Sequence, residues 1–230
     1  MKLKIIKDNY EIVDLEDYRE LAGPVEEKQW KDGRSAKEFA RYLLSNNGNL
    51  PKELASLIEQ YYVCENIIVY PEYLTGFGKY DMDHRGPRHH DGLLVGEKVV
   101  VGIEAKADEP LDNKYLSEYD CEKKRYKNIS MQLFGDSPDR HPDIRYQLCS
   151  ATMATLIEAY ERNKKNAIVL IISFLSEANT KRENIERNKK DIQAFKNSLV
   201  SLGDDCFETP FSKSKGISLY VKTIDIYLDK

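Results

Sequence analysis

Hydrophobic positions follow helical spacing in some segments of the chain and strand-like runs in others. Residues 35–44 and 51–62 carry apolar side chains three and four apart, as in helices with one buried face. Continuous apolar runs at 66–70 and 167–174 have the length and the Val/Ile content of buried strands. The order of such segments predicts an α/β protein whose mixed central sheet is flanked by helices.

Local signals place the remaining elements. Ser35 and Glu38 have capping-box spacing at the start of the first helix. A turn-rich loop is expected over 76–87, a polar helical region up to Phe134, a helix capped by 141–143, and a charged helix over 179–199. The final segment, 217–228, changes its apolar parity at 222–223, which predicts a bulge or two strands.

The segment 89–106 has the pattern of a β-hairpin with charged residues in its strands. Two apolar runs are joined by a Gly-Glu-Lys turn. Asp91 lies in the first run, and Glu104 and Lys106 lie on one side of the second. Neighbouring carboxylates repel each other and are costly to desolvate, and a divalent cation such as Mg²⁺ or Mn²⁺ would relieve that cost. We expect the three charged groups to converge on a metal-dependent hydrolytic site.

The acid-x-Lys pattern by itself does not specify a site. It also occurs in polar segments that end at Lys28, Lys114 and Lys124, whereas Glu104-Ala-Lys106 ends an apolar strand. The alternative for Glu104 and Lys106 is a surface ion pair on an edge strand, worth ~0–1 kcal/mol. The neighbouring aspartate favours the metal site over the ion pair.

Asp91, a short spacer and Glu104-Ala-Lys106 at the end of a Val/Ile strand resemble the motif of the PD-(D/E)XK nuclease superfamily. The resemblance covers residues 72–106 best and extends more loosely from 30 to about 174. It implies a restriction-endonuclease-like fold, a three-layer core with a mixed sheet between helices. The chain departs from the motif at 88–90, where Arg-His-His replaces the proline.

The resemblance also implies a role for each motif residue. Asp91 and Glu104, with the backbone carbonyl of Ala105, would hold Mg²⁺ or Mn²⁺. Lys106 would orient the attacking water or help to deprotonate it. The catalytic set is therefore expected to be Asp91, Glu104 and Lys106.

Four further residues are secondary candidates. Gln147 lies on the helix after the hairpin, where some superfamily members carry a glutamine; an ordinary polar position is the alternative. Arg145 has the planar fork that binds phosphate. Glu72 follows a predicted strand and could add an acid beside Asp91, and Glu38 lies on the helix where the superfamily often places another carboxylate.

Cysteines and histidines add little chemistry. The four cysteines form no CxxC pair, which predicts reduced, mainly structural thiols: Cys64, Cys121, Cys149 and Cys206. A zinc site from His89, His90 and Asp91 is an alternative, but adjacent strand residues point to opposite faces and zinc needs converging ligands.

Composition predicts a folded protein that works in the cytoplasm. With 230 residues, 41% of them hydrophobic, the chain can bury a substantial core, and no apolar run is long enough to suggest a membrane partner. We expect one nuclease-like domain over 1–230, with an N-terminal extension at 1–30, a core at 31–175 and a C-terminal helix and strands at 176–230. The net charge of −4 excludes a generally basic surface but permits local phosphate contacts.

The sequence therefore predicts a hydrolase, a Mg²⁺-dependent nuclease acting on nucleic acid, with DNA favoured. The rival hypothesis is a non-catalytic module on the same fold that binds nucleic acid or a partner protein through its basic clusters. Whether the enzyme would act as an endonuclease or an exonuclease, and whether it forms a homodimer, is left open by the sequence.

Overall fold

A nine-stranded mixed sheet organises the computed structural model, which describes residues 1–62, 65–82, 86–112, 114–120, 123–176 and 180–228. The strand order is β2-β1-β3-β4-β5-β6-β9-β8-β7. The strands are β1 (Lys2–Lys7), β2 (Tyr10–Glu11), β3 (Asn66–Thr75), β4 (Arg88–Val95), β5 (Val99–Lys106), β6 (Asn166–Leu175), β7 (Val200–Gly203), β8 (Cys206–Glu208) and β9 (Ser218–Tyr227).

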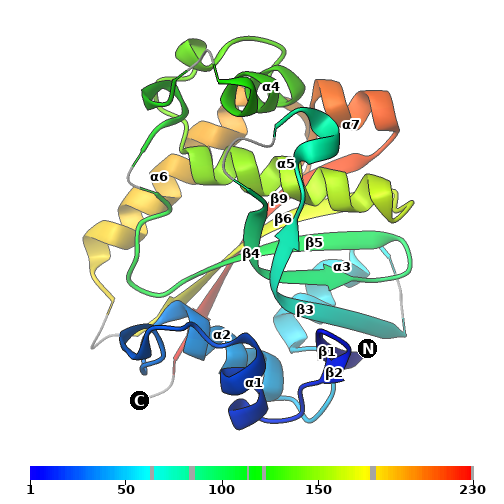
Figure 1. Ribbon diagram of the computed structural model, residues 1–230, viewed down its shortest axis with the longest axis vertical. Coiled ribbons are helices and arrows are strands. Elements are labelled where there is room, and N and C mark those ends of the chain that lie inside the picture. Colours follow the sequence, from blue (N-terminus) through cyan, green and yellow to red (C-terminus); the bar gives the residue numbers. More distant parts are fainter. Residues whose placement is uncertain (63–64, 83–85, 113, 121–122, 177–179, 229–230) are drawn as a thin grey trace.

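Seven α-helices in the described residues cover this sheet. They are α1 (Leu15–Ala22), α2 (Ser35–Leu44), α3 (Lys52–Glu59), α4 (Lys124–Leu133), α5 (Tyr146–Glu161), α6 (Arg182–Ser198) and α7 (Pro210–Lys215). Short 3-10 turns lie at η1 (Glu27–Gln29), η2 (Gly78–Tyr80), η3 (Leu116–Glu118) and η4 (Pro138–Arg140). Figure 1 shows α1 and α2 on one side of the sheet and α4, α5 and α7 on the other. The predicted mixed sheet flanked by helices is confirmed.

The pairing of the strands separates an antiparallel part of the sheet from a parallel part. Strands β3, β4 and β5 form an antiparallel meander, while β5, β6 and β9 run parallel. Strand β6 is buried along nearly its whole length, as its continuous apolar sequence predicts. The helix α5 connects the meander to β6, so it lies against the strands that carry the predicted site.

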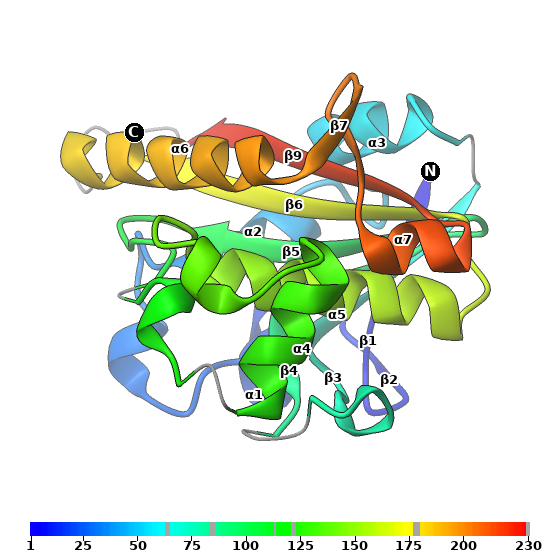
Figure 2. The ribbon, with the colours of Figure 1, turned by 90° about the horizontal axis from the view of Figure 1, so that it is seen from above.

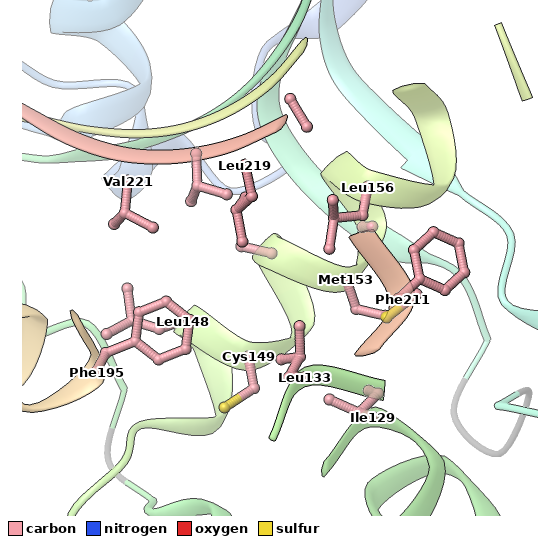
Figure 3. Packing of buried hydrophobic residues seen from close by; sticks show 14 of the residues in the cluster. Ile129, Leu133, Leu148, Cys149, Met153, Leu156, Phe195, Phe211, Leu219 and Val221 are labelled. Atoms are coloured by element: carbon pink, nitrogen blue, oxygen red, sulfur yellow. The ribbon is translucent and has the colours of Figure 1, made fainter. Parts of the chain in front are cut away.

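The larger hydrophobic core lies between the sheet and the layer of α4 to α7. Figure 2 shows α5 next to β5 with α4 outside it. Figure 3 shows the middle of this core, where α5 side chains meet those of α4, α6, α7 and β9. Among the buried side chains are Ile129, Leu148, Met153, Phe195 and Leu219. Because α5 is enclosed on several sides, the polar residues at its first turn are held in fixed positions.

Two glycines allow helices to approach the hairpin closely from both faces. A Cβ atom on Gly92 would lie 2.8 Å from the ring of Phe39 in α2. A Cβ atom on Gly102 would lie 2.0 Å from Thr155 Oγ1 in α5 and 3.1 Å from the His90 ring. A larger residue at either position would require Phe39 of α2 or Thr155 of α5 to shift away from the strands that carry the acidic residues.

Several predicted boundaries are wrong. Helix α2 has Arg34 at its N-cap without a side-chain cap, so the capping box predicted at Ser35 does not form; Ser35 Oγ instead donates to Glu109 Oε1 over 3.3 Å. Helix α5 begins at Tyr146, after the predicted cap at 141–143. The C-terminal segment is one continuous strand, β9, that pairs with β6 without a break in register, so neither a bulge nor a second strand is present there.

The first thirty residues take part in the fold. Strand β1 pairs parallel with β3, and α1 packs its buried Tyr18 against the half-buried Trp30 with ring centroids 6.0 Å apart. The predicted start of the charged helix, Asn179, lies outside the described residues, and α6 is observed from Arg182.

Two of the four cysteines are within the described residues, and both Cys149 and Cys206 are free thiols. Cys64 and Cys121 lie outside the described residues. Within the described ranges, no helix combines the length and the apolar character that a membrane crossing requires.

Candidate active site

The sheet opens between β4 and β5 at the predicted acidic residues. Strand β4 pairs with β3 from Arg88 to Val95 but with β5 only from Gly92 onward, and the last β4–β5 pair joins Gly92 to Ile103. Figure 1 shows β4 turning away from β5 at this point. Asp91 on β4 and the end of β5 from Glu104 therefore border a gap in the ladder.

The side chain of Asp91 fills part of this gap. Its Oδ2 accepts a hydrogen bond from the backbone N–H of Ala105 over 2.6 Å, so a carboxylate takes the place that a β4 carbonyl would occupy in a regular ladder. In an antiparallel ladder, the C=O and N–H groups of one residue point to the same neighbouring strand. The Ala105 carbonyl thus faces the same opening as the Asp91 carboxylate.

Glu104 is buried, and both its oxygens have partners. The guanidinium of Arg88 forms an ion pair with Oε1, and Gln147 Nε2 donates to Oε2 over 2.7 Å. The structure therefore places Gln147, a secondary candidate from the sequence, on the predicted metal ligand itself. Glu104 is therefore bound by Arg88 of β4 and by Gln147 in the first turn of α5.

The charges at the opening act on one another. Burial raises the pKa of Glu104 to about 7, the neighbouring Asp91 adds to the rise, and the Arg88 guanidinium and Lys106 amine oppose it. The two positive groups do not fully offset the desolvation, so the pKa of this carboxyl stays above its ordinary value. The charges of Asp91 and Lys106 thus both act on Glu104.

Glu72 and Asp91 lie where the β3–β4 ladder is interrupted, between the pairs Pro71–Gly92 and Tyr73–His90. Its φ of 46° is left-handed, which is rare for a residue with a side chain inside a strand. Lys7 stabilises this kink because its Nζ donates to the carbonyls of Pro71 and Glu72 over 3.2 and 2.9 Å. Burial raises the pKa of Glu72 to about 7, with Asp91 contributing. The structure therefore brings Glu72 beside Asp91.

Lys106 ends β5 half-buried. Across the described ranges, its amine makes no hydrogen bond or ion pair, although its charge acts on Glu104. An amine beside acidic residues and without a fixed partner is available to a water molecule or a phosphate oxygen.

The donor atoms fit a hard divalent cation. Two carboxylates and a backbone carbonyl are oxygen ligands of the kind that Mg²⁺ and Mn²⁺ prefer. Two buried polar atoms around Glu104, Arg88 Nε and Gln147 Oε1, have no hydrogen-bond partner, which marks the site as incompletely satisfied. In the part of the chain that the structure describes, no three His, Cys, Asp or Glu side chains form a ready metal cluster. A cation would require Arg88 to leave Glu104.

Two sequence candidates lie elsewhere. Glu38 Oε1 accepts hydrogen bonds from the Gly33 N–H and from Arg41 over 2.7 and 3.1 Å, so it stabilises the start of α2. The guanidinium of Arg145 is buried and donates to Asp191 over 2.8 Å and to the Tyr115 hydroxyl over 2.9 Å. The structure assigns Arg145 to a buried ion pair instead of a phosphate contact.

Arg88 and Lys7 were missed by sequence reasoning. Arg88 carried a signal, because a guanidinium three residues before Asp91, at the start of a strand that becomes apolar, needs a partner for its charge. No sequence pattern pointed to Lys7, because its contacts with β3 depend on the pairing of segments more than sixty positions apart.

Comparison with known proteins gives one family. A family model described as a domain of unknown function, DUF6946, matches residues 11–226. No curated protein and no solved structure matches the chain.

Proposed function

This chain belongs to the DUF6946 family, and we propose that it is a metal-dependent nuclease that hydrolyses phosphodiester bonds in nucleic acid, with DNA as the favoured substrate. The proposal includes a restriction-endonuclease-like core. The antiparallel meander β3–β4–β5, followed by α5 and the parallel strand β6, supports that finer description of the mixed sheet. The function itself is argued from the site.

The observation that carries the proposal is the hydrogen bond from the Ala105 N–H to Asp91. It ties the aspartate to the residue between Glu104 and Lys106, at the place where the sheet opens. A surface ion pair on an edge strand would need neither a buried glutamate nor an aspartate bound to the strand backbone. Here β5 lies inside the sheet between β4 and β6, and Glu104 is 1% exposed.

Each residue has a role that follows from its contacts. Asp91, Glu104 and the Ala105 carbonyl would hold Mg²⁺ or Mn²⁺, which supplies charge that lowers the pKa of water and polarises the phosphate. Gln147 fixes the orientation of Glu104 through its hydrogen bond. Lys106 places the attacking water and offsets negative charge that develops on the phosphate.

The ion pair between Arg88 and Glu104 favours a second candidate function. If this guanidinium stays on Glu104, the carboxylate is not free to hold a cation, and the protein would bind nucleic acid or a protein partner without cutting. The unpartnered Arg88 Nε and the acidic pair at the opening argue for exchange of the arginine for a metal. The two functions differ in whether catalysis occurs.

The test is a cleavage assay with purified full-length protein. Linear duplex, circular duplex and single-stranded DNA, and RNA, are incubated with Mg²⁺, Mn²⁺ or EDTA. Glu104→Gln and Lys106→Ala are run beside wild type, with Lys124→Ala as the matched control. Lys124 is also the lysine of an acid-x-Lys pattern, but it is exposed and paired with Asp81.

The nuclease proposal expects metal-dependent cleavage by wild type and Lys124→Ala and its loss in Glu104→Gln. Equal cleavage by wild type and Glu104→Gln would point to a contaminating enzyme and remove support for the site. Binding of nucleic acid without cleavage under every metal would select the non-catalytic function.

A further inference from the structure

A cleft of about 470 Å³ opens beside the candidate active site. Its lining includes three carboxylates, those of Glu72, Asp91 and Glu109. The segment between α1 and α2 contributes Lys28 and Arg34 to the same lining. Two acidic residues of the candidate site therefore share one cleft with two basic residues from the N-terminal part of the chain.

This combination of charges suits an anionic substrate. A phosphodiester that approaches Asp91 meets three carboxylates, whose repulsion has to be offset for binding. Lys28 and Arg34 supply the opposite charge within the same cleft. The guanidinium of an arginine binds phosphate through two parallel hydrogen bonds, and the lysine amine acts as a point charge.

Both basic side chains are accessible. Arg34 is exposed and, within the described ranges, makes no hydrogen bond or ion pair through its guanidinium. Lys28 is exposed and forms an ion pair with Glu26 over 2.8 Å. Both partners of that pair are open to solvent, so water and salt weaken it, and a phosphate can replace Glu26 at little cost.

We propose that Lys28 and Arg34 form a phosphate-binding subsite that holds a single nucleic-acid strand in the cleft that Asp91 also lines. This inference rests on the proposed function, because it treats Asp91 as the point where the strand is cut. The N-terminal segment thereby acts as the substrate-binding wall of the active site. Lys28 and Arg34 position the strand and do not take part in the bond cleavage.

The volume of the cleft fits a single strand better than a duplex. Pockets of ~300–1,000 Å³ enclose one small-molecule-sized ligand, which corresponds to a nucleotide-sized unit. The double helix would have to present its phosphates without entering such a cleft, whereas an unpaired strand can lie within it. Proteins that bind single strands commonly follow the backbone with a basic groove.

The experiment measures binding separately from cleavage. Fluorescence anisotropy follows a labelled short single-stranded DNA and the matching duplex with full-length protein, in EDTA and in Ca²⁺. The variant Lys28→Ala/Arg34→Ala is compared with Lys31→Ala/Lys52→Ala, which removes the same charge from exposed positions that do not line the cleft. Melting temperatures establish that both variants fold.

For the cleft variant, affinity for the single strand should fall by about ten-fold. The slope of log K against log salt should decrease by ~1.4, because each phosphate contact on a single strand contributes ~0.7. The control variant should retain wild-type affinity.

Equal losses in both variants would overturn the inference, as would tighter wild-type binding of the duplex or no binding of either DNA. The proposed function is judged by cleavage. If the cleft variant loses affinity while wild type never cuts, the phosphate-binding subsite is supported and the nuclease function is rejected. If wild type cuts and the cleft variant binds normally, the nuclease function is supported and the subsite is rejected.

Discussion

The Asp91 carboxylate accepts a hydrogen bond from the backbone N–H of Ala105 over 2.6 Å, across the point where β4 leaves β5. A side chain thus completes the ladder in place of a backbone carbonyl. Because the bond joins the aspartate to the residue after Glu104, the two acidic positions cannot move independently. Their charges raise the free energy of the metal-free site, which a bound cation would lower.

The first prediction concerns metal binding. Asp91→Ala and Glu104→Ala should each greatly weaken Mg²⁺ and Mn²⁺ binding, because each removes one of two carboxylate ligands. Isothermal titration calorimetry measures the affinity, and Glu38→Ala is the control because that buried glutamate binds Gly33 and Arg41 instead. Unchanged Mn²⁺ affinity in the first two variants would count against the site.

The second prediction concerns the competition between Arg88 and a cation for Glu104. At a pH well above 7, where Glu104 is ionised, Arg88→Ala should bind Mg²⁺ more tightly than wild type, because the guanidinium no longer occupies Oε1. Near pH 7 the gain should shrink, since loss of the guanidinium raises the pKa of Glu104 further. Calorimetric titrations at the two pH values test this, and weaker binding at high pH would show that Arg88 supports the metal site.

The third prediction separates catalysis from binding at Lys106. Lys106→Ala should leave metal affinity and nucleic-acid affinity nearly unchanged, because the lysine is not a metal ligand and is one of many basic residues. Its single-turnover cleavage rate should fall by ~10²–10⁴-fold. Lys106→Arg should recover only part of the rate, because a guanidinium differs in shape and cannot act as a base. Wild-type cleavage by Lys106→Ala would refute the role.

The fourth prediction follows from the raised pKa of Glu104. A carboxyl whose pKa rises from its ordinary 4.5 to about 7 on folding binds more protons in the folded state between those pH values. Its contribution therefore lowers the free energy of unfolding as pH rises from about 4.5 to about 7, and the loss persists above that. Glu72 shifts in the same direction.

Glu104→Gln mimics the protonated carboxyl, so in EDTA it should match wild type near pH 5 and be more stable near pH 8. At high pH, Mn²⁺ should restore the stability of wild type but not that of the variant. Thermal unfolding followed by tryptophan fluorescence measures both effects. A variant less stable than wild type at pH 8 would show that ionised Glu104 is well compensated.

The fifth prediction concerns the packing that holds α5 on the hairpin. Gly102→Ala should destabilise the fold by ~1–3 kcal/mol or more, because the added methyl meets Thr155 Oγ1. Adding Thr155→Ala should recover part of the loss by removing that oxygen. Urea unfolding measures the difference, and Gly76→Ala, whose Cβ has open space, is the control. Equal stability of Gly102→Ala and wild type would mean that α5 shifts without cost.

Patterns that depend on neighbouring residues were readable from the sequence. The continuous apolar run at 167–174 predicted the buried strand β6, because a strand covered on both faces has no polar face. The hairpin of β4 and β5 followed from two apolar runs and a short turn. Asp91, Glu104 and Lys106 were identifiable because charged side chains in such apolar strands are costly to bury without a partner or ligand.

Features that depend on partners far along the chain could not be predicted from the sequence. The first strand, β1, is short and carries several lysines, so its place in the sheet follows only from pairing with β3. The parity change at 222–223 did not signal a break, because the second half of β9 is only partly covered and needs no strict alternation. The cap of α2 shifted because Ser35 bonds Glu109 from another segment.

By itself, the sequence determined which residues could form an acidic hairpin site, since alternation along a strand is a local property. Only the tertiary structure decided the state of that site. It placed Arg88 and Gln147 on Glu104, tied Asp91 to Ala105, and brought Lys28 and Arg34 into a cleft that Asp91 and Glu72 also line. Desolvation and charge coupling depend on what surrounds a group in space, and folding brings those surroundings from segments that the chain order keeps apart.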